Sequence, residues 1–166
     1  MAGKDGADAI KDGRDETESE RLDRNWADIL QELRVVQTGT QILTGFLLTL
    51  PFQQRFTSLE PPEVVIYLAL VSLAALATLL ALTPVALHRG LFRRHALGFI
   101  VRIANRLMRA SLLTIALTLT GTALLVFSVV LSLTAGIVAA AVVLVLSGVG
   151  WLWLPLFARR YRAKRD

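Results

Sequence analysis

Three polar residues inside an otherwise apolar segment are the side chains of this sequence best placed to do chemistry. Gln37, Gln41 and Thr44 lie in VVQTGTQILTGFLLTL, residues 35–50, and their spacing places them on one side of a helix. Their neutral oxygens could line a small polar pathway and coordinate a cation. They could equally pair with polar groups of a neighbouring helix, and the pattern favours this helix contact over a pore.

Ionisable groups are absent from the apolar parts of the sequence. Glu63 follows two prolines, where a carboxylate complements the positive end of a helix, so it reads as a capping residue. His88 and His95 lie among arginines without acidic neighbours, which makes a poor metal site. There is no cysteine, which excludes thiolate chemistry. The sequence therefore predicts that the protein has no catalytic residue, no metal site and no cofactor, and that it is not an enzyme.

The elements that carry these residues are long apolar runs. Residues 63–87, about 110–131 and 135–157 are each long enough to cross a hydrocarbon core of roughly 30 Å, which needs about 20 apolar residues. Residues 35–51 form a shorter and more polar fourth run, acceptable for a helix packed inside a bundle. The content of 54% hydrophobic residues and the mean hydropathy of +0.57 are also typical of a membrane protein. We predict an all-α membrane protein with four transmembrane helices.

The segments outside these spans differ strongly in charge. Residues 1–20 are rich in acids and predict a disordered N-terminal tail without a signal peptide. Leu22–Val36 repeats apolar residues at helical spacing, which predicts an interfacial amphipathic helix running into the first span, with Trp26 near the headgroups. The transmembrane domain would cover residues 21–157, and residues 158–166 would form a basic cytoplasmic tail.

The distribution of lysine and arginine predicts the orientation. Three arginines precede the first span, one lies in the first loop, six lie in the second loop region, none lies near Thr134, and five basic residues follow the last span. Lysine and arginine are enriched on the cytoplasmic side of membrane proteins. All of these counts therefore agree with four spans and with both termini in the cytoplasm.

The basic second loop predicts contact with anionic lipid headgroups. Arg93, Arg94, Arg102, Arg106 and Arg109 lie beside apolar spans, and the last three share one side of an amphipathic helix continuous with the third span. The favoured interpretation is that these arginine side chains extend along the apolar surface to reach the headgroups. The alternative is that they bind a specific lipid or an acidic partner. Nucleic acid is not an expected partner, since stacking platforms and base-reading motifs are missing.

Small and hydroxylated residues form stripes that would let the helices approach closely. They are Arg34, Thr38, Gln41, Gly45 and Thr49 on the first span; Tyr67, Ala74, Thr78 and Ala81 on the second; Thr114, Thr118, Gly121, Leu125 and Ser128 on the third; and Gly136, Ala140, Val143, Ser147 and Gly150 on the fourth.

The segment QELRVVQTGTQILTGFLLTLPFQQRF, residues 31–56, resembles an uncharacterised family of short actinobacterial membrane proteins, catalogued as a domain of unknown function, and the layout resembles it over residues 16–157. The resemblance implies a four-helix plasma-membrane protein and supplies no catalytic residues. Some members carry a sodium:proton antiporter label, with which the absence of membrane carboxylates conflicts. We expect a structural or accessory interaction protein, a homo-oligomer or the partner of another membrane protein. The alternative is a small oligomeric transporter or channel.

Overall fold

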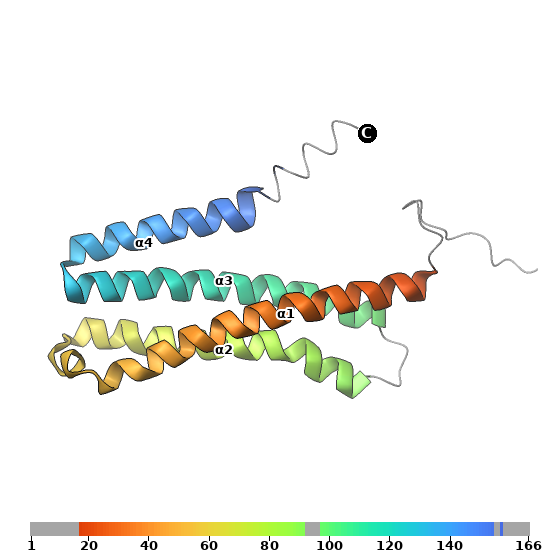
Figure 1. Cartoon of the computed structure of the whole chain (residues 1–166), viewed down its shortest axis with the longest axis horizontal. Helices are drawn as coiled ribbons and strands as arrows, with labels where there is room; N and C mark the ends of the chain where they lie inside the picture. The colour runs from red at the N-terminus through yellow and green to blue at the C-terminus, as the bar shows by residue number, and fades with distance from the viewer. Residues whose placement is uncertain (1–16, 92–96, 155–156, 158–166) are drawn as a thin grey trace, which may run out of the picture.

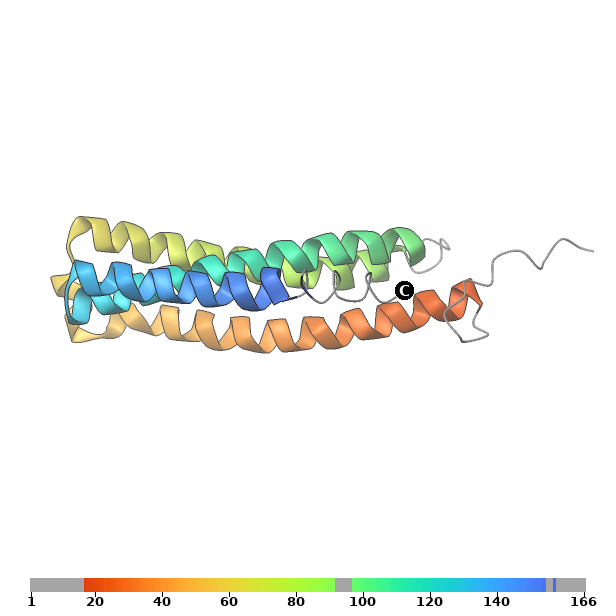
Figure 2. The same cartoon turned by 90° about the horizontal axis from the view of Figure 1, so that it is seen from above.

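The computed structural model describes residues 17–91, 97–154 and 157, and in these residues the chain is helical without any strand. The elements in order are α1 (Glu18–Thr49), the 3-10 turns η1 (Leu50–Phe52) and η2 (Gln54–Ser58), α2 (Pro61–Leu91), α3 (Leu97–Val130), α4 (Leu133–Gly148) and the π-helical turn η3 (Val149–Trp153). α1, α2 and α3 lie side by side, and α4 runs back along α3 (Figures 1 and 2). The all-helical prediction is confirmed.

A capping box fixes the start of α1. The Thr17 hydroxyl accepts a hydrogen bond from the Glu20 amide at 3.4 Å, and the Glu20 carboxylate accepts one from the Thr17 amide at 2.8 Å. The Thr17 amide, and then the Thr17 hydroxyl, which donates to the same carboxylate at 2.7 Å, lower the pKa of Glu20 below its ordinary value. The helix therefore begins at Glu18, inside the segment predicted as a tail of residues 1–20. Residues 1–16 of that predicted tail lie outside the described residues.

Prolines fix the turn between α1 and α2. Pro51 falls in η1 directly after α1, and Pro61 and Pro62 occupy the first turn of α2, where a missing amide proton costs nothing. The Glu63 carboxylate accepts a hydrogen bond from the Glu60 amide at 2.9 Å. This bond places Glu63 in the capping position that the sequence indicated.

Three helices are long and apolar enough to cross a membrane: Pro61–Gly90, Phe99–Val130 and Leu133–Trp151. α1 is not among them, because no stretch of it long enough to cross a membrane is sufficiently apolar. α1, α2 and α3 hold 32, 31 and 34 residues, so each is roughly 46–51 Å long at 1.5 Å per residue. A hydrocarbon core of roughly 30 Å is shorter than these helices. Part of the three-helix bundle therefore has to extend beyond a bilayer.

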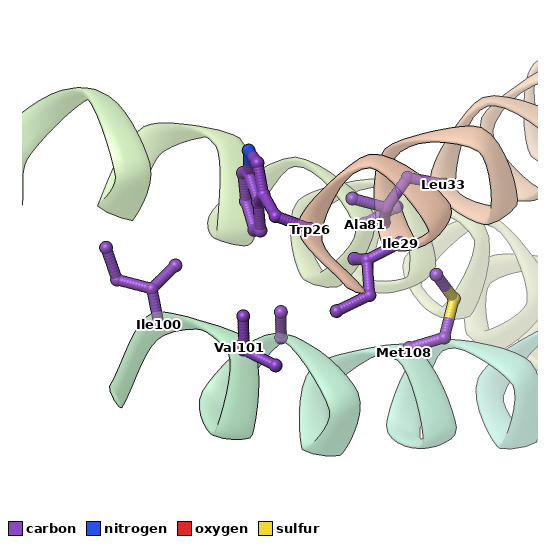
Figure 3. Packing of buried hydrophobic residues seen from close by; sticks show 8 residues of the cluster. Trp26, Ile29, Leu33, Ala81, Ile100, Val101 and Met108 are labelled. Atoms are coloured by element: carbon purple, nitrogen blue, oxygen red, sulfur yellow. The ribbon is translucent and has the colours of Figure 1, made fainter. Parts of the chain in front are cut away.

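One hydrophobic cluster joins α1, α2 and α3 at the end of the bundle where α1 begins (Figure 3). Trp26, Ile29 and Leu33 come from α1, and the Trp26 ring stands next to α2 (Figure 3). Its buried members are Trp26, Ile29, Leu33, Ala81, Ile100, Val101, Ala104 and Met108. The apolar face of the helix predicted to be interfacial, Leu22–Val36, is covered by α2 and α3. The structure therefore adds a packing role for this face, which the sequence pattern assigns to the membrane interface.

A second cluster holds the other end of the same three helices. Leu47 of α1, Tyr67, Leu70 and Ala74 of α2, and Leu125 of α3 are buried in it. Phe56 of η2 meets the Tyr67 ring edge-on, with centroids 5.0 Å apart. The turn between α1 and α2 is thus packed onto the bundle.

α4 attaches through a close approach to α3. The Ser132 hydroxyl caps α4 by accepting a hydrogen bond from the Ala135 amide at 3.3 Å. Gly136 is buried, and a Cβ there would overlap the Ser128 hydroxyl and lie 2.7 Å from the Leu124 carbonyl oxygen. Among the described helices α4 contacts α3 alone, so most of its surface is exposed.

Candidate functional site: the outer face of the first helix and the basic surface

The three polar residues of the first span do not converge on a cavity in one chain. Gln41 is exposed, whereas Gln37 and Thr44 are half-buried. The Thr44 hydroxyl oxygen is itself buried and has no hydrogen-bond partner in the described part of the chain. The pocket at the far end of α1 is lined by other residues. The arrangement leaves the Gln41 amide on the outer surface of α1.

The small-residue stripe predicted on the first span lies on the wrong side for packing within the chain. Arg34, Thr38, Gln41, Gly45 and Thr49 are all exposed, and a Cβ added to Gly45 would meet nothing within 4 Å. Their exposure corrects the prediction for this helix. We call Thr38, Gln41, Ile42 and Gly45 the outer face of α1.

The buried side of α1 instead follows a seven-residue repeat. Residues at spacings of three and four face α2 and α3, and they are Trp26, Ile29, Leu33, Val36, Thr40, Leu43, Leu47 and Leu50. This is the heptad pattern of helices that pack nearly parallel in a bundle. The repeat is visible in the sequence and could have identified the buried side.

The stripes predicted on the other helices do face the interior. Tyr67, Ala74 and Ala81 of α2 and Thr114, Thr118 and Leu125 of α3 are buried. On α4 Gly136 is buried and the rest of the stripe is half-buried.

The threonine hydroxyl groups of these stripes are satisfied within their own helix, whereas the buried Ser128 hydroxyl has no partner among the described residues. The Thr118 hydroxyl donates to the Thr114 carbonyl at 2.8 Å, and the Thr78 hydroxyl donates to the Ala74 carbonyl at 3.0 Å. Only the Ser111 hydroxyl is seen to donate across helices in the described residues, to the Ala77 carbonyl of α2 at 3.4 Å. The threonine hydroxyls of these stripes therefore bond within their own helices, and in the described part of the chain a single serine hydroxyl bonds across a helix contact.

The basic surface is partly described. Arg102, Arg106 and Arg109 are exposed on one side of α3 near its start, as the sequence predicted. None of the three forms an ion pair with another described residue, and only the Arg109 Nε is engaged, donating a hydrogen bond to the Asn105 carbonyl at 3.3 Å. Arg93 and Arg94 lie outside the described residues. What these arginines bind remains a prediction.

His88 serves packing at the same end of the bundle. Its ring stacks on Trp26 with centroids 4.6 Å apart and an interplanar angle of 22°. His95 lies outside the described residues. Among the described residues, no group of three or more His, Asp or Glu side chains could hold a metal ion.

Comparison with known proteins identifies a family. The model of the Family of unknown function (DUF6328) matches residues 15–155, nearly the whole helical region. No curated protein and no solved structure matches the chain. The resemblance seen in residues 31–56 is thus confirmed at the level of the family. The chain belongs to the Family of unknown function DUF6328.

Proposed function

We propose that the chain is an integral plasma-membrane protein in which all four helices cross the bilayer and both termini are cytoplasmic. The packing of α1 supports its crossing, since the helix contacts α2 and α3 from Trp26 to Leu50, over the length of two apolar helices. The arginine distribution supports the orientation. In this arrangement the Trp26 end extends into the cytoplasm, with Arg102, Arg106 and Arg109 facing anionic headgroups.

The role we propose is structural or accessory: the protein binds other membrane helices and has no catalytic activity. The observation that carries this proposal is the exposed Gln41 amide on the outer face of α1. A polar group facing hydrocarbon without a partner costs several kcal/mol, whereas a second helix can offer both hydrogen bonds and close approach at Gly45. The second helix comes from another copy of the chain or from a partner membrane protein. α4, which contacts only α3 among the described helices, leaves a second surface for such contacts.

A photo-crosslinking amino acid at position 41 tests this role. We expect a covalent adduct with protein, either a second copy or another membrane protein, when the full chain is irradiated in native membranes. The matched control is position 79, because Leu79 is 64% exposed on the apolar surface of α2 and should yield lipid adducts. Lipid adducts alone at position 41 would contradict the proposed role.

A small transporter or channel built from several copies is the second candidate. The exposed Gln41 and the unpaired Thr44 hydroxyl favour it, because symmetric copies could surround a pathway lined by Gln37, Gln41 and Thr44. Proton coupling normally requires ionisable groups such as Asp, Glu or His within the membrane, and none of these lies between the ends of the four proposed spans. We therefore expect no sodium-dependent proton flux in proteoliposomes. Flux that is lost in Gln41→Leu would promote this candidate over the first.

A further inference from the structure

A pocket of about 220 Å³ lies at the end of the bundle opposite Trp26. Phe46 lines it from the end of α1 and Leu50 from η1, Val126 and Val129 line it from α3, and Phe56 lines it from η2. An engineered apolar cavity of about 150 Å³ stays free of water and binds benzene. This pocket is similarly apolar and partly open to its surroundings, so its lining suits an apolar occupant.

The lining is almost wholly apolar, and its residues come from two parts of the chain. Phe46 and Val126 belong to the proposed spans, whereas Gln53 and Arg55 belong to the turn between α1 and α2. Arg55 is exposed. It forms no ion pair with any described residue, and this includes the nearby acids Glu60 and Glu63. The Glu63 carboxylate is instead bonded to the Glu60 amide. A hydrocarbon-lined pocket therefore has a free cation at its rim.

We propose that this pocket binds one anionic glycerophospholipid of the outer leaflet, with an acyl chain against Phe46 and Val126 and the phosphate at Arg55. The inference rests on the proposed membrane orientation of α1. A phospholipid matches this site because the apolar residues would lie at the membrane depth of its acyl chain and Arg55 would lie at the depth of its headgroup. It is separate from the arginines of α3, which lie at the opposite end of the bundle.

The two parts of the site make different contributions. An acyl chain gains little by moving from bulk lipid into an apolar pocket, because lipid tails are as apolar as the pocket wall. An empty pocket, however, would forfeit the dispersion contacts of its lining atoms. The tail therefore fills the space, and Arg55 supplies the preference for negative charge.

Native mass spectrometry of the full chain in mild detergent tests the site, with phosphatidylglycerol and phosphatidylcholine of identical acyl chains as probes. We expect one tight phosphatidylglycerol adduct. Arg55→Gln should weaken it roughly fivefold, as expected for one arginine at an anionic surface. Val126→Phe fills the pocket and should weaken binding of both lipids. Arg34→Gln and Val35→Phe are matched controls for charge and volume, since both residues are exposed on α1 and lie well before Phe46 in the helix.

Two results would overturn the inference: equal affinity for the two lipids in the wild type, or an Arg55→Gln variant that binds phosphatidylglycerol as the wild type does. Thermal unfolding of each variant in the same detergent identifies a loss that comes from misfolding. If Arg55→Gln misfolds, Arg55→Lys is tested in its place because it keeps the positive charge. We expect it to bind phosphatidylglycerol like the wild type, and weaker binding by a folded Arg55→Lys would also count against the site. Labelling of a cysteine at position 54 separates the two proposals: outside labelling with no effect of Arg55→Gln would refute the lipid site alone.

Discussion

Trp26→Ala should lower the free energy of unfolding more than any other single replacement in α1, by about 3 to 5 kcal/mol. Trp26 is 8% exposed and fills the space between α1, α2 and α3, with the His88 ring stacked on it. Truncation leaves a cavity at the end of the bundle that we place outside the hydrocarbon. There the surrounding solvent is water, so the hydrophobic effect acts fully.

Unfolding of the full chain in mild detergent, followed by circular dichroism, measures this effect. Trp153→Ala is the matched control because it removes the same side chain from a position that is 56% exposed, and a change within about 0.5 kcal/mol is expected for it. Equal losses for the two variants would show that Trp26 does not anchor α1 to the bundle.

Gly136→Ala should be the most damaging small change in α4, with a loss of about 1 to 3 kcal/mol. A methyl group there overlaps the Ser128 hydroxyl and lies 2.7 Å from the Leu124 carbonyl oxygen, which belongs to the backbone and cannot turn aside. α3 and α4 would have to separate. Since α4 contacts no other described helix, nothing else would hold it in place.

Gly148→Ala provides the comparison on the same helix. A Cβ at position 148 meets nothing within 4 Å, so alanine should be neutral or slightly stabilising through its higher helix propensity. The same unfolding measurement applies to both variants. A neutral Gly136→Ala would contradict the close approach of α3 and α4.

The helices themselves were predictable from the sequence because length and hydropathy report on them directly. The three strongest apolar runs became α2, α3 and α4, and the arginines at 102, 106 and 109 were correctly placed on one side of a helix continuous with the third span. The capping box at Thr17 and Glu20 was also readable as T-x-x-E, yet the acidic composition around it concealed the start of α1.

The side of α1 that is buried was harder to predict. Thr38, Gln41 and Gly45 formed a plausible packing stripe by residue type alone, but the heptad through Leu33, Thr40 and Leu47 determines which side faces the bundle. The pocket at Arg55 could not be predicted, because it depends on how η1 and η2 fold back over α1 and α3. Local periodicity carries no information on such contacts.

Single-cysteine labelling tests the four-span arrangement most directly, because the chain has no cysteine of its own. Variants with cysteine at position 2, 54, 98, 134 or 163 are exposed to a membrane-impermeant maleimide in intact cells. We expect labelling from outside at positions 54 and 134, and labelling at positions 2, 98 and 163 only after the membrane is opened. Outside labelling at position 98, or protection of position 54, would contradict the account.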